Sequence, residues 1–260
     1  DTGNREWKTE VYEPVATAPT ATAESVFVLA DDVLLALDPE TGTRNWTYNM
    51  PGESNNVDPA PVVGNGFVYA CTDSDGLCAV DAETGELVWE TTSEDLMEHT
   101  NRCRIRSTPT VAGDTLYVGV SDFVMALDAY TGEQKWKFKT GSYVYNAPTV
   151  ADGVVFVPSW DESIRGIDVE TGDLLWEFEA LAKVSASPIV SDGVLYMASE
   201  GPGTDHGYVY AVEPDVIESG VSSEDTCALY GTSGHHDTRI RELREGDTTS
   251  DSTSVDKQDE

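Results

Sequence analysis

The chain has 260 residues, with 48 Asp and Glu against 15 Lys and Arg, which gives a formal net charge of -33. This charge excludes a basic nucleic-acid-binding protein. Hydrophobic residues make up 39% of the sequence, enough to build a core. No apolar run approaches the roughly 18–20 residues of a membrane-spanning helix. We therefore expect no nucleic-acid partner and no transmembrane segment.

Most of the negative charge lies in the body of the chain. Residues 214–260 hold 12 acidic and 4 basic residues, a charge of -8, whereas residues 1–213 hold 36 and 11, a charge of -25. Such a surface repels itself at low ionic strength, but molar salt shortens the Debye length to about 3 Å and screens the repulsion. The composition resembles that of proteins from halophilic archaea and predicts adaptation to high salt.

A Trp motif recurs along the chain. Five of the six Trp end a Thr-Gly-x-x-x-Trp unit, at successive spacings of 39, 43, 47 and 40 residues. An Asp precedes four of these units in fixed register, and a Pro opens each repeat, at Pro19, Pro61, Pro109, Pro148 and Pro188. We interpret the motif residues as structural docking positions: Trp7, Asp38, Gly42, Trp46, Asp81, Gly85, Trp89, Asp128, Gly132, Trp136, Asp168, Gly172 and Trp176.

Each repeat predicts four short antiparallel strands. In the second repeat they fall around residues 61–63 and at 67–71, 77–80 and 87–90, rich in β-branched and aromatic residues and bounded by turn signals. Four-stranded units of about 40–45 residues in tandem indicate a β-propeller. The fold class is therefore all-β, a β-propeller of four-stranded antiparallel blades, with about five blades in residues 1–213. The Trp is expected to lie between blades and the Gly to supply a positive φ in the turn.

The run Ala-x-Asp-x-x-Thr-Gly-x-x-x-Trp, as in residues 79–89 and 126–136, resembles the tryptophan-docking motif of the PQQ-like (pyrroloquinoline-quinone) repeat propellers. That resemblance implies two functional classes. One comprises quinoprotein alcohol dehydrogenases, which bind PQQ and Ca²⁺. The other comprises non-catalytic propellers such as the lipoprotein scaffold of the outer-membrane assembly machinery. The fold by itself does not choose between them.

The fifth repeat lacks the motif that ends the others, whereas residues 1–10 carry a motif with no inner strands before it. Two interpretations stay open. Since propellers typically have about 4–8 blades and the family commonly has about eight, the chain is either a piece of a seven- or eight-bladed ring or a five-bladed ring that residues 1–10 close. Residues 214–260, rich in Ser, Thr, Asp and Glu, are predicted to be a disordered tail.

The loops between the second and third strands, and the connectors between repeats, are expected to meet on one face of the propeller. Those loops are mostly acidic, but one connector holds three of the nine Arg. Because guanidinium groups match carboxylates bidentately, this face is expected to bind a protein partner or a small ligand. Two alternatives to ligand binding stay open. The Arg residues of this connector pair with neighbouring acidic loops, and Trp160 packs within its own loop. The candidate residues are Arg102, Arg104, Arg106, Tyr145, Asn146, Trp160 and Asp161.

The family resemblance implies further residues for a quinoprotein enzyme. These are a vicinal Cys pair and an acidic set for Ca²⁺, but the cysteines are Cys71, Cys78, Cys103 and Cys227. The segment 73–76, Asp-Ser-Asp-Gly, resembles part of a Ca²⁺ loop and lacks its bidentate Glu. We expect no catalytic residue, no metal site and no required cofactor, and favour a non-catalytic binding scaffold. The alternative is a PQQ-dependent alcohol dehydrogenase.

Two expectations concern the environment of the chain. The family resemblance favours an extracytoplasmic or cell-surface location, with the cytoplasm as the alternative. Cys71 and Cys78 flank a predicted hairpin and could form a cross-strand disulfide, although four Cys allow three full pairings.

The acidic body predicts that salt stabilises the fold. The melting temperature should fall as NaCl is lowered from molar to tens of millimolar, because screening of the repulsion is lost. Circular dichroism during heating measures this, with sucrose at matched osmolarity as a control that adds no ions. An unchanged melting temperature across the series would contradict the adaptation to salt.

Overall fold

The computed structural model describes residues 3, 5–50, 59–72, 76–97, 104–201 and 206–216. The chain divides into two units, Asp1–Tyr230 and Gly231–Glu260, and every described residue belongs to the first. Most of the predicted tail lies outside the described residues, so its disorder stays a prediction. The only helix among the described residues is α1 (Ser93–Met97), and no described helix is long and apolar enough to cross a membrane.

The described residues form an all-β fold of antiparallel sheets, which confirms the predicted propeller class. We call the sheets blades 1 to 5 in chain order. The strands of blades 1 and 2 are β1 (Thr20–Ala21), β2 (Val26–Ala30), β3 (Val33–Leu37), β4 (Arg44–Asn49), β5 (Val62–Gly64), β6 (Phe67–Cys71), β7 (Gly76–Asp81) and β8 (Leu87–Thr92).

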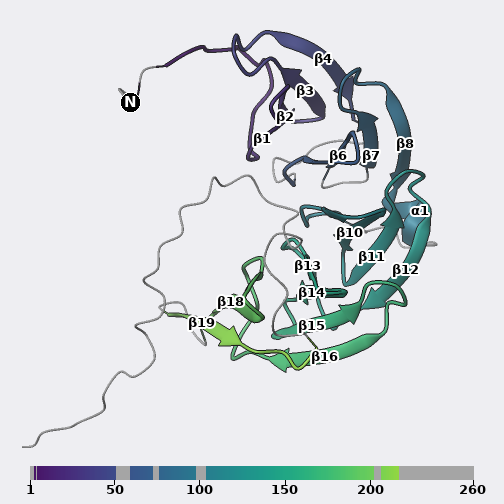
Figure 1. Ribbon diagram of the computed structural model, residues 1–260, viewed down its shortest axis with the longest axis vertical. Coiled ribbons are helices and arrows are strands. Elements are labelled where there is room, and N and C mark those ends of the chain that lie inside the picture. The colour runs from purple at the N-terminus through teal and green to yellow at the C-terminus, as the bar shows by residue number, and fades with distance from the viewer. Residues whose placement is uncertain are drawn as a thin grey trace, which may run out of the picture. The chain divides into compact units, whose positions relative to one another are not determined.

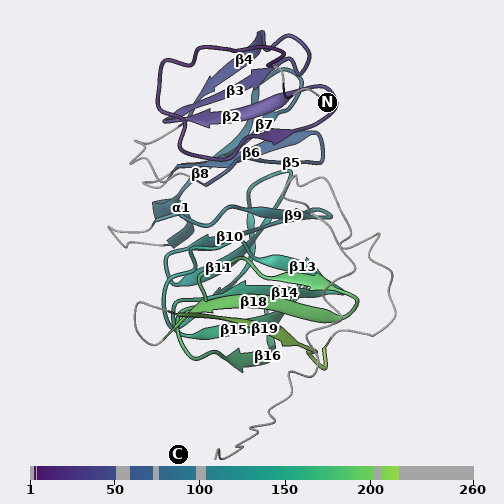
Figure 2. The same cartoon turned by 90° about the vertical axis from the view of Figure 1, so that its left-hand side faces the viewer.

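The remaining strands of the described residues make three further blades. They are β9 (Thr110–Ala112), β10 (Thr115–Val120), β11 (Phe123–Asp128), β12 (Gln134–Lys139), β13 (Thr149–Ala151), β14 (Val154–Pro158), β15 (Ser163–Asp168), β16 (Leu174–Glu179), β17 (Ile189–Ser191), β18 (Val194–Glu200) and β19 (Gly207–Val212). Within each blade the strands pair in chain order. In Figure 1 the fourth strands β4, β8, β12 and β16 follow one another along the outer edge of the blades, and in Figure 2 blades 1 to 4 follow one another from top to bottom.

A small residue lies opposite the Trp in each four-stranded blade. The cross-strand pairs are Ala36 with Trp46, Ala79 with Trp89, Ala126 with Trp136 and Gly166 with Trp176. Directly opposite residues share a face of the sheet, so the small side chain leaves room for the indole. The strand register shifts immediately after each small residue. This explains why the small residue recurs at a fixed distance from the Trp.

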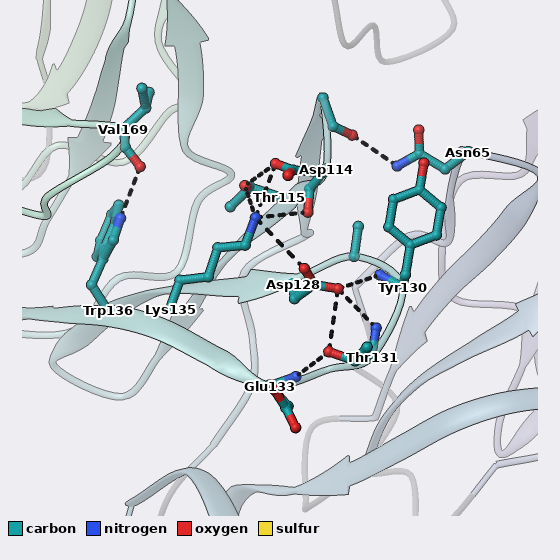
Figure 3. Close-up of polar contacts among 12 residues, drawn as sticks. Asn65, Asp114, Thr115, Asp128, Tyr130, Thr131, Glu133, Lys135, Trp136 and Val169 are labelled. Atoms are coloured by element: carbon teal, nitrogen blue, oxygen red, sulfur yellow. Dashed lines mark hydrogen bonds and ion pairs between the residues drawn. The ribbon is translucent and has the colours of Figure 1, made fainter.

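The Trp side chains join neighbouring blades. The indole Nε1 of Trp46, Trp89 and Trp136 donates to a carbonyl in the turn of the next blade, at Ala82 (3.1 Å), Ala129 (2.9 Å) and Val169 (2.8 Å). Figure 3 shows the bond from Trp136 to Val169. Burying an aromatic side chain of roughly 150–250 Å² contributes about 4–6 kcal/mol as an upper bound. We call each contact a Trp junction.

The turn that receives each Trp is held by an Asp. Asp81 Oδ1 accepts hydrogen bonds from the backbone N–H of Thr84 (2.8 Å), from the Thr84 hydroxyl (3.0 Å) and from the N–H of Glu83 (3.0 Å). The backbone bond from Thr84, followed by its hydroxyl, lowers the pKa of Asp81 below its usual value, because hydrogen bonds to a carboxylate favour its charged form. The two backbone bonds recur at Asp38, Asp128 and Asp168.

Polar side chains also stabilise the end of blade 3 that carries the turn between β11 and β12 (Figure 3). Lys135 Nζ donates to Asp114 Oδ1 at 2.9 Å and to Thr115 Oγ1 at 2.8 Å, and it lies 3.8 Å from Asp128 Oδ2. The hydrogen bond from Lys135 lowers the pKa of Asp114. Asn65 Nδ2 donates to the Gly113 carbonyl at 2.8 Å and links blade 2 to blade 3. This end of the blades is thus committed to internal contacts.

A second junction links the first strands and explains the Pro of each repeat. The Thr that follows Pro donates its hydroxyl to the Pro carbonyl of the next blade, from Thr20 to Pro61 (2.5 Å), Thr110 to Pro148 (2.6 Å) and Thr149 to Pro188 (2.6 Å). Blade 2 has Val62 at this position, which has no hydroxyl to donate.

Residues 5–11 form no strand and pair with no sheet. Among the described residues the fifth sheet consists of β17, β18 and β19 alone. Residues 5–11 therefore do not add the fourth strand that a closed five-bladed ring requires. Instead Trp7 Nε1 donates to the Pro39 carbonyl at 2.9 Å. A Cβ on Gly42 would lie 2.5 Å from the Trp7 ring. The Trp7 ring therefore covers the turn Gly of blade 1, in the same way as the Trp of each junction covers the turn Gly of the next blade.

The proposed disulfide between Cys71 and Cys78 is wrong. Both cysteines are buried and are not bonded to each other. In the ladder of β6 and β7, Cys78 pairs with Ala70 and Cys71 pairs with Leu77. Adjacent residues of a strand point to opposite faces, so the two thiols lie on opposite sides of the sheet. Burial raises the pKa of the Cys78 thiol to about 12.

A pair of Gly substitutions separates the Trp junction from the backbone conformation. Gly132 and Gly153 both have positive φ, 75° and 77°. A Cβ on Gly132 would lie 2.7 Å from the Trp89 ring, whereas one on Gly153 meets nothing within 4 Å. We expect Gly153→Ala to cost about 1 kcal/mol for the positive φ and Gly132→Ala about 1–3 kcal/mol more for the clash. Denaturant unfolding measures both, and equal losses would contradict the junction.

Candidate functional site

One end of the blades carries both the loops after the second strands and the connectors between blades. A backbone bond joins a loop to a connector in three successive blades, from Ser121 N–H to Arg104 C=O (2.9 Å), from Trp160 to Tyr143 (3.0 Å) and from Glu200 to Lys183 (3.0 Å). We call this surface the loop face. It comprises connector residues 104–108, 141–147 and 181–187 and loop residues 121–122 and 159–162.

The three carbonyl acceptors occupy equivalent positions. Arg104, Tyr143 and Lys183 each lie five residues before the Pro that opens the next repeat. All three side chains are exposed. The residue that follows each of them is buried. We call these three residues, Ile105, Val144 and Val184, the buried anchors. Each connector is therefore fixed by a buried aliphatic side chain and presents its neighbours outward.

Two cations flank a group of three aromatic rings across these connectors. Arg106 Cζ lies 5.4 Å from the ring centroid of Tyr145. The Tyr145 ring stacks on Tyr143 at 5.2 Å and 7°, and it meets Trp160 edge to face at 4.3 Å and 83°. Lys183 Nζ lies 4.4 Å from the Trp160 centroid. We call these five residues the cation–aromatic ladder.

The ladder spans three connectors and one loop. A cation over a ring face contributes about 0.5–1 kcal/mol when exposed and about 2 kcal/mol when desolvated, so the contacts favour one arrangement of long side chains. Lys183 forms no ion pair with any residue that the structure describes. The ladder thus holds positive charge beside aromatic surface in an otherwise acidic chain.

The side chain of Asp161 contacts two other residues of the protein, Gly141 and Arg165. Its Oδ2 accepts the N–H of Gly141 at 2.6 Å and lies 2.7 Å from Arg165 NH1. Arg165 NH2 lies 2.8 Å from Glu177 Oε1 on the neighbouring strand. The side chains of Asp161 and Arg165 are each 13% exposed. Because Gly141 opens the connector of Tyr143 and Tyr145, Asp161 ties that connector to the loop of Trp160.

The structure brings together Arg106, Tyr145 and Trp160 of the sequence-derived candidates. Arg104 is exposed in the same connector as Arg106, and the Asn146 carbonyl accepts the Ser107 hydroxyl at 3.0 Å. Arg102 lies outside the described residues. Two ladder residues, Tyr143 and Lys183, are not among the candidates, although counting back from the Pro of each repeat would have found them.

The described residues do not fit PQQ with Ca²⁺ as the resemblance implies it. Cys71 and Cys78 lie on opposite faces of a sheet, so they supply no vicinal pair. Within residues 3, 5–50, 59–72, 76–97, 104–201 and 206–216, no three His, Cys, Asp or Glu side chains form a cluster suited to a metal. The Asp-Ser-Asp segment at 73–75 lies outside these ranges.

Comparison with protein families gives a match to a model described as "Outer membrane protein assembly factor BamB", over residues 1–111 and 93–216. BamB of Vibrio cholerae is 31% identical over 130 residues, which is 47% of this chain and 34% of that protein. The dehydrogenase subunit of alcohol dehydrogenase (quinone) from Gluconobacter oxydans is 29% identical over 151 residues, 49% of this chain and 20% of that protein.

The fold also matches solved structures. BamB from Moraxella catarrhalis has a TM-score of 0.63 at 19% identity, over 77% of this chain and 62% of that one. The chain covers about a fifth to a third of the two curated relatives. The relatives include both an assembly factor and an enzyme subunit, so similarity supports the propeller and does not choose between scaffold and enzyme.

The link through Asp161 predicts a stability cost at the loop face. Asp161→Asn removes the charge opposite Arg165 and places an amide between two donors, so unfolding free energy should fall by about 1–3 kcal/mol. Glu162→Gln is the matched control because it changes the same charge at an exposed neighbour. Thermal unfolding at one salt concentration compares them. Equal stability of the two variants would contradict the link.

Proposed function

We propose that this chain, which belongs to the protein family described as outer membrane protein assembly factor BamB, is a non-catalytic scaffold that binds a protein partner through its loop face. The observation that carries the proposal is the cation–aromatic ladder. Tyr, Trp and Arg are the residues that dominate binding energy at protein interfaces. Functional residues also tend to lie on loops held by a rigid framework.

The exposure of the ladder supports contact with a macromolecule. Tyr143 is 46% exposed, and Leu181, in the same connector as Lys183, is 60% exposed. The buried anchors Ile105, Val144 and Val184 hold the connectors in place before any partner arrives. A surface fixed in advance loses less conformational entropy on binding. Rigid presentation of aromatic side chains therefore favours an interface.

The second candidate function is a quinoprotein alcohol dehydrogenase, because a curated relative carries that name. In that case PQQ and Ca²⁺ would be required cofactors. The exposed Tyr143 and Leu181 of the loop face favour the scaffold over this alternative. We also propose an extracytoplasmic location, since the name of the relative from Vibrio cholerae refers to the outer membrane.

Site-specific photo-crosslinking tests the scaffold function. A photoreactive benzophenone amino acid replaces Tyr143 on the loop face or, as the matched control, Tyr130 in the turn of blade 3, which is 50% exposed. In cells that make the protein, position 143 should give a discrete adduct with one protein, identified by mass spectrometry, and position 130 should not. Adducts of equal yield at both positions, or none at 143, would contradict loop-face binding.

Titration of the purified chain with PQQ and Ca²⁺ tests the rival function. The scaffold predicts no stoichiometric binding by absorbance and no dye-linked oxidation of alcohols. Binding of one quinone per chain together with turnover would reject the scaffold and support the enzyme.

A further inference from the structure

Blade 5 exposes the face that each earlier blade buries against the next one. In blades 1 to 4 the residue two positions before the small residue opposite Trp is fully buried, at Leu34, Leu77, Val124 and Ile164. The cross-strand row of Ile189, Tyr196 and Ala211 in blade 5 matches the rows of those blades, so Val209 is the equivalent residue. Val209 is 82% exposed and Ile189 is 65% exposed. We call this apolar surface the open face.

The edge of the same blade also accepts a further strand. Among the described strands β19 pairs with β18 alone, whereas the third strand of each earlier blade pairs with a fourth. The sequence of β19 contains no charged residue and no Pro, which are two of the features that protect edge strands from pairing. The backbone groups on the outer edge of an antiparallel strand are ready to pair with another chain. The open face and this edge together form an acceptor for a fourth strand.

Blade 1 carries the complementary half of a blade interface. Val15 follows Pro14, which lies five residues before Pro19, so Val15 occupies the position of the buried anchors. The buried anchor Val144 packs in one cluster with Val124 of the preceding blade. Val15, in contrast, is 49% exposed. The side of blade 1 that would meet a preceding blade is therefore incomplete.

Residues 5–10 already have the form of a fourth strand. Their exposed and half-buried side chains follow the same order as those of β4 and β16, although the segment pairs with no sheet. Trp7 holds the segment on blade 1 through its bond to the Pro39 carbonyl. The segment has two acidic and two basic residues, so it brings no net charge to an acidic neighbour.

We propose that a second copy of this chain completes blade 5. Residues 5–10 of that copy add the fourth strand beside β19, and its blade 1 covers the open face. Because the donor segment and the acceptor edge are different surfaces, the contact is head to tail. Two copies close it by exchanging strands, and a longer series continues it. This interface is separate from the loop face and does not depend on the partner proposed there.

The register of the added strand follows from the other blades. Trp7 lies opposite Ala211, as Trp46 lies opposite Ala36 in blade 1, and this places residue 10 opposite Tyr208. The bond from Trp7 to its own blade 1 is retained, so docking breaks no contact that the single chain makes through this side chain. Val15 of one copy then packs on Val209 of the other, as Val144 packs with Val124.

Sedimentation equilibrium of the 260-residue chain tests the association at molar NaCl, where repulsion between acidic copies is screened. We expect a mass of at least two copies that falls on dilution. Val209→Asn should raise the dissociation constant about tenfold or more, because an apolar side chain no longer gains from burial. Val88→Asn is the matched control, because Val88 is exposed on β8 and lies outside the open face.

Thermal melts at the same salt concentration establish that both variants are folded. The control should leave the dissociation constant unchanged. A mass of one copy at every concentration would overturn the proposal, and so would equal effects of the two substitutions.

Photo-crosslinking between labelled and unlabelled copies locates the contact. A benzophenone amino acid replaces Tyr208 in an unlabelled chain, which is mixed with an unsubstituted chain labelled with heavy nitrogen and irradiated at molar NaCl. Mass spectrometry should find adducts with labelled peptides from residues 5–18. Tyr130, exposed in the turn of blade 3, is the matched control position and should give none. Adducts confined to unlabelled peptides would show closure within one chain and overturn the proposal, as would adducts elsewhere in the labelled copy.

Discussion

The Trp junction is the contact on which the arrangement of the blades depends. An indole ring from one blade covers a Gly in the turn of the next and donates its N–H to a carbonyl of that turn. The contact works only if three local conditions hold together. A small residue must lie opposite the Trp, an Asp must hold the turn, and the Gly must adopt positive φ. These conditions explain why several residue types recur as one motif.

The contacts of the Trp motif lie at one end of the blades. There the Asp, Thr and Trp side chains bond to their own turn or to the next blade, and Lys135 of blade 3 bonds to Asp114 and Thr115. At the other end, buried aliphatic anchors fix the connectors and the residues on either side of each anchor vary. Arg104, Tyr143 and Lys183 occupy one repeat position with three different chemistries. The loop face is thus where the repeat can acquire a specific partner.

The acidity of the chain bears on the difference between the Trp-motif end of the blades and the loop face. Negative charge spread over the body predicts that concentrated salt stabilises the fold, and the cations of the ladder belong to a small set of 15 Lys and Arg. The aromatic contacts matter here because packing persists when salt screens charge.

The sequence by itself determined the repeat, the strands of each blade and the residues of the Trp motif, because these depend on local spacing. It also indicated the face on which Arg106, Tyr145 and Trp160 lie. Tertiary structure decided what depends on strand register and on neighbouring blades. The register of β6 and β7 places Cys71 and Cys78 on opposite faces of the sheet. The Thr hydroxyls donate to Pro carbonyls about 40 residues away. Lys183 of one connector contacts the ring of Trp160 in a loop. Such contacts join residues far apart in sequence, so no local pattern specifies them.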